Sequence, residues 1–177
     1  MRLTSFSDYS LRVLVYLGVR DGELATVADI AAAYGISANH LMKVVHQLGR
    51  HGYVETLRGK GGGLRLAREP GRINLGELVR RTEEKRLVEC FDGNSTCRIE
   101  SACVLRGILG EALESFFAVL DRHTLADLLR PQRRLAKVLV FVPPPARALA
   151  VRPRGRFSPP CRCAPSIPRG PIPGIPT

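Results

Sequence analysis

The 177-residue chain has no run of 18 or more apolar residues, so we expect none of its segments to span a membrane. Its first residues, Met1 to Asp8, also lack the apolar stretch and small-residue cleavage site of a secretory signal. Both absences predict a cytoplasmic protein, whose thiols stay reduced. The five cysteines therefore indicate metal binding or redox sensing rather than disulfides.

Acidic residues are missing from the end of the chain. Residues 143–177 contain six arginines and eleven of the thirteen prolines, but no aspartate or glutamate. A segment of this composition cannot pack a core, so we expect a disordered tail. Cys161 and Cys163 lie in this tail, and without a scaffold they are not expected to be ligands.

The net charge of +11 is unevenly distributed. The tail accounts for six positive charges, and the remaining excess of five falls entirely within residues 37–72. A localised basic patch is typical of a nucleic-acid binder, and a solvated basic face is the alternative. The basic residues of this segment are Lys43, Arg50, Arg58, Lys60, Arg65, Arg68 and Arg72.

Residues 1–82 show the pattern of a winged helix-turn-helix domain. A largely apolar helix is expected from Ser5 or Ser7 to about Arg20, which indicates a buried helix. The capping box Thr26-Val-Ala-Asp29 opens a short second helix that Gly35 closes. A third helix is expected from Ser37 to Gly52, and two helices joined by a tight glycine-containing turn predict a helix-turn-helix.

Two short alternating runs, 53–57 and 64–66, flank the glycine-rich sequence Arg58-Gly-Lys-Gly-Gly-Gly63. This arrangement predicts a β-hairpin, the wing of the domain, with a basic tip. A phosphate-binding loop is excluded because no strand-loop-helix context or Gly-Lys-Ser/Thr follows. Asn74 should cap one more helix, to about Thr82.

The expected organisation continues with a loop at 83–103, helices at 104–142 and the tail at 143–177. From Leu105 to Leu120, apolar residues recur at helical spacing and form a wide stripe. One small domain cannot easily bury that stripe, so we expect a second copy of the chain to cover it. Thr124-Leu-Ala-Asp127 should cap a short final helix. The predicted fold class is mainly α with a small β-hairpin wing.

Three cysteines, Cys90, Cys97 and Cys103, lie within 14 residues of this loop. Thiolates suit both iron–sulfur clusters and zinc, and the residue types alone leave both open. Structural zinc prefers four ligands and Cys-x2–4-Cys spacing, which neither gap has. Buried free thiols are less consistent with the polar residues of the loop.

Four segments of the chain resemble a known family. They are Thr4–Leu14, Ser37–Lys43, Arg58–Gly63 and Thr124–Leu128, in matching order and spacing from Met1 to about Val142. The chain is similar to the NsrR-type repressors, nitric-oxide sensors related to the cluster-assembly regulator IscR. The resemblance implies a winged-helix homodimer with one iron–sulfur cluster per subunit, either 2Fe-2S or 4Fe-4S, that represses nitric oxide defence genes.

The resemblance also implies the ligands of the cluster. Cys90, Cys97 and Cys103 would hold it, and three cysteines leave one position open. In IscR-like proteins a histidine follows the last cysteine by three residues, where this chain has Arg106. In NsrR-like proteins an aspartate of the partner subunit can serve, and Asp8 matches its position. Alternatively, Ser5-x-x-Asp8 is a helix capping box.

The third helix should present Ser37, Asn39, His40 and Lys43 outward on its early turns. Residues there reach base edges in the major groove, and asparagine can read adenine through two hydrogen bonds. Arg58 and Lys60 of the wing should follow the minor groove or the backbone of a two-fold symmetric operator.

The sequence thus predicts a DNA-binding repressor, not an enzyme, that senses nitric oxide. The alternative is a regulator of the same fold that senses iron–sulfur or redox status. An iron–sulfur enzyme or electron carrier is disfavoured, because the chain lacks both the Cys-x3-Cys-x2-Cys run and the four-cysteine pattern of ferredoxins.

Overall fold

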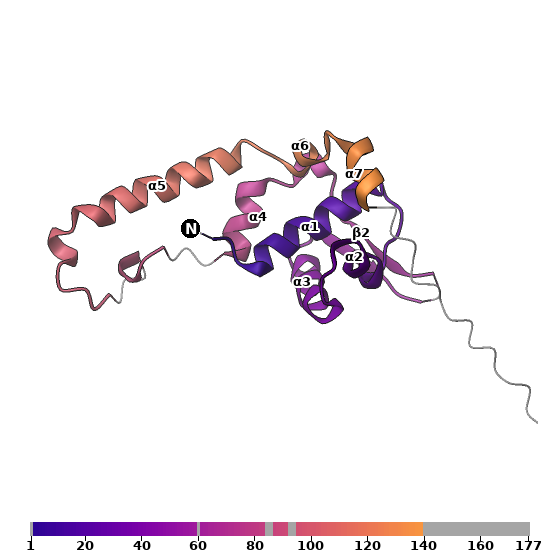
Figure 1. Ribbon diagram of the computed structural model, residues 1–177, viewed down its shortest axis with the longest axis horizontal. Helices are drawn as coiled ribbons and strands as arrows, with labels where there is room; N and C mark the ends of the chain where they lie inside the picture. The colour runs from indigo at the N-terminus through magenta and orange to yellow at the C-terminus, as the bar shows by residue number, and fades with distance from the viewer. Residues whose placement is uncertain (1, 60, 84–86, 92–94, 140–177) are drawn as a thin grey trace, which may run out of the picture. The chain divides into compact units, whose positions relative to one another are not determined.

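The computed structural model describes residues 2–59, 61–83, 87–91 and 95–139. Its residues up to Leu139 belong to one compact unit, built from helices and one antiparallel hairpin (Figure 1), as the sequence predicts. Among the described residues, no helix has the length and apolar character needed to cross a membrane. The elements are α1 (Ser5–Val19), α2 (Val27–Tyr34), α3 (Ala38–Arg50), β1 (Val54–Leu57), β2 (Gly63–Leu66), η1 (Pro70–Arg72), α4 (Leu75–Thr82), η2 (Glu89–Phe91), η3 (Glu100–Ala102), α5 (Val104–Asp121), α6 (Leu125–Leu129) and α7 (Gln132–Leu139).

Helix α1 begins at a cap that the sequence analysis did not identify. Thr4 is the N-cap, and its hydroxyl oxygen accepts a hydrogen bond from the Ser7 backbone N–H at 3.2 Å. The alternative interpretation of Ser5-x-x-Asp8 as a capping box is therefore wrong. The Asp8 carboxylate instead pairs with Arg12 one turn later, with an Nη2–Oδ2 distance of 2.9 Å. Asp8 is thus free of any capping role.

The helix-turn-helix of α2 and α3 forms as predicted. The Asp29 N–H donates to the Thr26 hydroxyl at 3.1 Å, and the Thr26 N–H donates to the Asp29 carboxylate at 2.8 Å. Gly35 ends α2 in the left-handed conformation, with φ of +64°, which a side chain would disfavour. This tight turn sends the chain directly into α3, the expected recognition helix.

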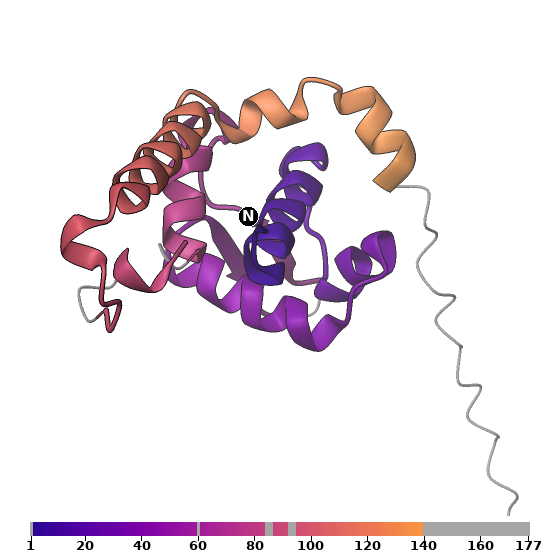
Figure 2. The same cartoon turned by 60° about the vertical axis from the view of Figure 1, so that its left-hand side comes forward.

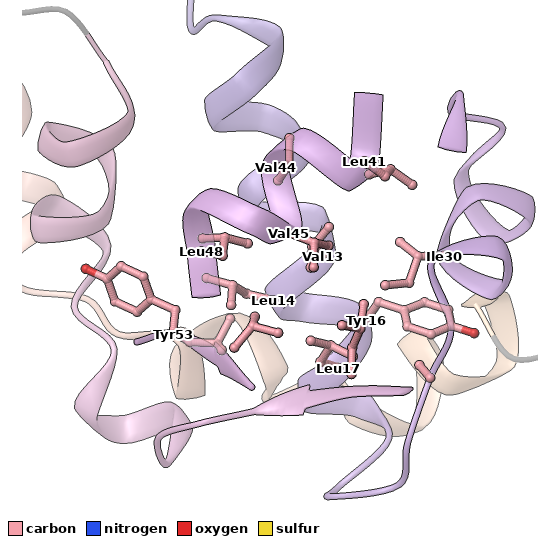
Figure 3. Packing of buried hydrophobic residues seen from close by; sticks show 14 of the residues in the cluster. Val13, Leu14, Tyr16, Leu17, Ile30, Leu41, Val44, Val45, Leu48 and Tyr53 are labelled. Atoms are coloured by element: carbon pink, nitrogen blue, oxygen red, sulfur yellow. The ribbon is translucent and has the colours of Figure 1, made fainter. Parts of the chain in front are cut away.

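The hydrophobic core lies around α1, as its apolar character predicted (Figure 3). Val13, Leu14 and Leu17 are at most 1% exposed. The inward face of α3 packs against them, and Tyr53 closes the cluster before β1. The buried face of α3 consists of the four residues expected from helical periodicity: Leu41, Val44, Val45 and Leu48.

The wing is a two-stranded hairpin in which Val54 pairs with Leu66 and Leu57 with Gly63. Ala25 adds a short bridge to it, because its N–H and carbonyl both bond to Leu64, at 3.0 and 2.7 Å. At the tip, Gly62 admits no side chain, since a Cβ there would overlap the Leu57 carbonyl oxygen. These contacts fix where the basic tip leaves the domain.

Helices α6 and α7 return to α1 on the side opposite α3 (Figures 1 and 2). Gly18 of α1 allows this approach, because a Cβ there would overlap the side chain of Leu129. Thr124 and Asp127 form the predicted capping box of α6. The expectation that α6 is the final helix is wrong: α7 follows and buries Leu139 against the core.

Candidate DNA-binding surface and cysteine segment

The outward face of α3 carries the four side chains of this helix that are expected to contact DNA. Ser37, Asn39, His40 and Lys43 are exposed, at the N-cap and on the first turns of the helix. The Ser37 hydroxyl makes no capping hydrogen bond, so it remains available to a ligand. The surface is therefore polar and positively charged where a recognition helix meets base edges.

Two hollows flank these residues and bring the start of α1 into the same surface. His40 and Lys43 line one together with Ser5, Phe6 and Tyr9. The second is bordered by the following side chains: Phe6, Asn39, Met42, Lys43, His46 and Gln47.

Only part of the predicted basic patch is available for DNA. Arg65 pairs across the hairpin with Glu55, and Arg72 pairs with Glu69 at 3.6 Å. Arg68 donates to the His51 carbonyl at 3.1 Å and lies over the Tyr53 ring. Arg65 and Arg68 thus contact other parts of the domain, whereas the Arg72–Glu69 pair joins near neighbours in sequence on the surface.

The remaining basic residues of the patch lie on the surface. Among the described residues, no acidic side chain pairs with Lys43, Arg50 or Arg58, and all three are exposed. Lys60 lies outside the described residues. Fewer of the seven basic residues are therefore without an acidic or backbone partner than the charge count suggested.

The cysteine segment runs between α4 and α5. Cys90 lies in η2, Cys97 in the following loop, and Cys103 is the N-cap of α5. All three carry free thiols; Cys97 is exposed and the other two are half-buried. Within the described ranges, no three His, Cys, Asp or Glu side chains are close enough together to hold a metal ion.

The three thiols still suit a soft metal centre by their chemistry. They lie outside the apolar core, and Cys103 lines an open hollow of about 610 Å³ with Phe91, the neighbour of Cys90. Arg106, which replaces the histidine of IscR-like proteins, pairs with Glu100 at 3.2 Å. A guanidinium held by a carboxylate is not a metal ligand, so Arg106 is not a candidate ligand.

Among the described residues, Asp8 is not gathered with the cysteines into a group that could hold a metal ion. Its partner Arg12 lies over the ring of Tyr34, with the guanidinium carbon 5.7 Å from the ring centre. Burial raises the pKa of Tyr34 to about 12, although the positive charge of Arg12 opposes the shift. Asp8, Arg12 and Tyr34 therefore connect α1 to α2 of the helix-turn-helix.

The start of α1 is also bonded to the end of α4, where the cysteine segment begins. The Glu83 carboxylate accepts hydrogen bonds from the Thr4 N–H at 2.6 Å and from the Thr4 hydroxyl at 3.0 Å. The Ser7 hydroxyl donates to the Thr82 hydroxyl oxygen at 2.7 Å. These bonds join the helix that carries Asp8 to Thr82, the last residue of α4, and to Glu83, which follows it.

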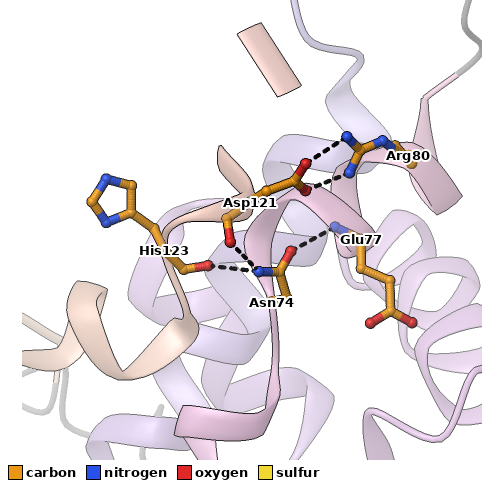
Figure 4. Close-up of polar contacts among 5 residues, drawn as sticks. All are labelled: Asn74, Glu77, Arg80, Asp121 and His123. Atoms are coloured by element: carbon orange, nitrogen blue, oxygen red, sulfur yellow. Dashed lines mark hydrogen bonds and ion pairs between the residues drawn. The ribbon is translucent and has the colours of Figure 1, made fainter. Parts of the chain in front are cut away.

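A second connection joins α4 to the C-terminal end of α5 (Figure 4). Arg80 donates two hydrogen bonds to the Asp121 carboxylate, at 2.5 and 2.7 Å, and lies 4.4 Å from the Phe117 ring centre. Asn74 donates to the Asp121 carbonyl at 2.7 Å while its own carbonyl oxygen caps α4. Gly76 has no room for a Cβ, which would overlap the Asp121 carboxylate. We name Asn74, Gly76, Arg80 and Asp121 the α4–α5 clamp.

The clamp fixes one end of α5, whereas its other end is uncovered. Phe117 is the single buried residue of the helix, while Val104, Leu105 and Ile108 are each more than half exposed. The hydrogen bonds from Arg80 lower the pKa of Asp121. The sequence carries no periodic signal for this clamp, because Arg80 and Asp121 lie 41 positions apart; the glycine within α4 is the one local hint.

A family model described as "Iron-dependent Transcriptional regulator" matches residues 3–131. The chain belongs to the Rrf2 family. It is 51% identical over 142 residues to the HTH-type transcriptional regulator NsrR of Bacillus subtilis, which covers 78% of this chain and 97% of that protein. It is 50% identical to the NsrR of Geobacillus kaustophilus, with the same coverage.

A solved structure also matches this Rrf2 protein. The IscR of T. potens aligns with a TM-score of 0.60 and 26% identity, covering 74% of this chain and 88% of that one. These relatives are regulators of transcription rather than enzymes, and they confirm the winged-helix fold expected from the sequence. The family also makes DNA the expected partner of this protein.

Proposed function

We propose that this Rrf2 protein is a cytoplasmic homodimeric repressor that responds to nitric oxide and controls genes for nitric oxide detoxification. The observation that carries the proposal is the combination of an exposed recognition helix with three free thiols on one segment. The name and the extensive similarity of the NsrR relatives support the choice of signal. The wing and the polar face of α3 would bind one half of a two-fold symmetric operator.

Each contact residue has a distinct expected role on DNA. Asn39 is suited to read adenine through two hydrogen bonds, and Lys43 to bind guanine or a phosphate. Ser37 and His40 lie beside them on the same exposed turns and can bind phosphate or base edges. Arg58, which directly follows β1, and Lys60, which lies outside the described residues, would follow the backbone or the minor groove.

Cys90, Cys97 and Cys103 would hold an iron–sulfur cluster, 2Fe-2S or 4Fe-4S, with Asp8 of the partner subunit as fourth ligand. When bound, the cluster supplies the iron atoms that react with nitric oxide. The thiols are not gathered in the described residues, so the segment would have to close around the cluster. An exposed segment without a packed core is suited to such a rearrangement.

The bonds of Thr4 and Ser7 to α4 offer a route from this segment to the DNA-binding surface. They fix the start of α1, and α1 packs directly on α3 through the core. A change in the position of Glu83 would therefore be transmitted through α1 to α3, the recognition helix, which packs against it.

DNA binding is tested by selecting duplexes from a random library with the full-length protein, purified without oxygen. Lys43→Ala should weaken binding and reduce the dependence of log K on log salt by about 0.9, the contribution of one phosphate. Lys137→Ala is the matched control, because Lys137 is exposed on α7, on the side of α1 opposite α3. An unchanged slope for Lys43→Ala would refute its assignment as a phosphate contact.

A second candidate signal is iron–sulfur or redox status, favoured by the description of the family as iron-dependent. The two candidates differ in what releases the DNA. Under this alternative, a chelator that removes iron would release the operator, whereas nitric oxide added to the iron-loaded protein would leave it bound.

A further inference from the structure

Helix α3 carries one large apolar side chain on its outward face. Met42 is 58% exposed, whereas Leu41, Val44, Val45 and Leu48 are buried. It borders the same open hollow as Asn39, Lys43 and His46. A single exposed apolar residue is ordinary on a protein surface, so its exposure alone indicates nothing. Its position among the polar residues of the recognition helix is the informative observation.

Met42 lies next to the residue suited to read adenine. At 100° per residue, Met42 is about 60° around the helix axis from Asn39 and one turn further along. Lys43 flanks Asn39 on the other side, and Arg50 is exposed further along the same helix. These charges favour a polyanion over an apolar peptide as the molecule that covers Met42.

We infer that Met42 reads the C5 methyl group of a thymine in the operator. Thymine is the base that presents a methyl group in the major groove, where apolar side chains recognise it. The unbranched thioether of methionine adapts to such a contact without a precise pocket. Asn39 and Met42 would then read A·T pairs together, one by hydrogen bonds and the other by an apolar contact. This inference rests on the proposed placement of α3 in the major groove.

The test uses the duplex obtained by selection, with each thymine of one half-site replaced in turn by deoxyuridine, which lacks only the methyl group. For the wild-type protein, one replacement should weaken binding about fourfold, as expected when one methyl group is no longer buried. Met42→Ala should bind the unmodified duplex about as weakly and lose the sensitivity to that replacement. Met42→Leu, which keeps an apolar side chain, should retain it.

Val138→Ala is the matched control, because Val138 is 73% exposed on α7, away from α3. It should bind both duplexes like the wild type. If no deoxyuridine replacement weakens wild-type binding, or if Met42→Ala keeps the same penalty, the inference is wrong although the protein still binds its operator. If no duplex is selected at all, the proposed function fails together with it.

Discussion

Asp8 is the residue whose role separates the proposed sensor from a simple DNA-binding protein. Its carboxylate pairs with Arg12 at 2.9 Å, and both side chains are about two-fifths exposed. A pair of this kind on a helix surface stabilises by only about 0.3–0.5 kcal/mol. Because Thr4 caps α1, the Asp8 carboxylate is held, among the described residues, only by this weak pair with Arg12. The carboxylate would therefore be available to the proposed cluster of a partner subunit.

Asp8→Ala should change the visible spectrum of the anaerobically purified protein and its response to nitric oxide, while unfolding free energy falls by less than about 1 kcal/mol. Arg12→Gln is the matched control, since it breaks the same ion pair but keeps the carboxylate. It should leave the spectrum intact.

Cys97→Ser is the positive control, and it should give a protein without iron or sulfide. Cys161→Ser and Cys163→Ser, in the segment outside the described residues, should stay brown. Identical spectra for Asp8→Ala and wild type would remove Asp8 from the ligand set.

The outward-facing side chains of α3 were predictable, because helical periodicity decides which side chains face the core. The four buried residues of α3 follow this period, so Asn39, His40 and Lys43 had to face outward. The same period places Met42 on the surface. The cap of α1 was not predictable in this way, since Thr4, Ser5 and Ser7 are all suitable N-caps and the Glu83 partner of Thr4 is 79 residues away.

At the scale of elements, the α4–α5 clamp determines how the long helix leaves the DNA-binding domain. Three contacts meet there: the paired hydrogen bonds of Arg80 to the Asp121 carboxylate, the Asn74 hydrogen bond to the Asp121 carbonyl, and the close approach of that carboxylate to Gly76. If α5 joins two subunits, the clamp would set the distance between their recognition helices.

Gly76→Ala should therefore destabilise the protein by about 1–3 kcal/mol, because the new methyl group forces the Asp121 carboxylate away. Gly71→Ala is the control, since nothing lies within 4 Å of a Cβ there. Thermal unfolding measures this loss of stability. If the clamp also sets the distance between the recognition helices, Gly76→Ala should discriminate less than wild type between half-site spacings. Binding to selected duplexes with one or two base pairs added between the half-sites measures this discrimination. Equal stability and equal spacing preference of the two variants would contradict the clamp.

The clamp should also respond to acid. The pKa of Asp121 is lowered by its bonds to Arg80, so the folded state binds this proton less readily than the unfolded chain. Its contribution is therefore present above the usual carboxyl pKa near 3.8 and is lost as the pH falls below it.

The sequence predicts helix α6 but not helix α7. The capping box of Thr124 and Asp127 predicted α6, because its signal is local. Helix α7, Gln132–Leu139, is only eight residues long and carries three basic residues, so its helical state depends on packing Leu135 and Leu139 against the core. Tertiary contacts of this kind cannot be read from propensity.

At the scale of the whole molecule, the exposed stripe of α5 predicts a dimer. Leu105→Glu or Ile108→Glu should yield a monomer, because a carboxylate would have to be buried between subunits. Val138→Glu, a comparable change at an exposed apolar residue of α7, should remain dimeric. Analytical ultracentrifugation distinguishes the two species. If both Leu105→Glu and Ile108→Glu remain dimeric, the interface does not lie on this stripe.

The central claim is that nitric oxide releases this protein from DNA by acting on its iron centre. The direct test is an anaerobic titration of nitric oxide into the brown protein bound to its selected, fluorescently labelled duplex, with absorbance and anisotropy recorded together. The account predicts that the visible absorbance of the cluster and the anisotropy fall over the same range of nitric oxide. Unchanged anisotropy after the absorbance has been lost, or full operator affinity in colourless protein, would contradict it.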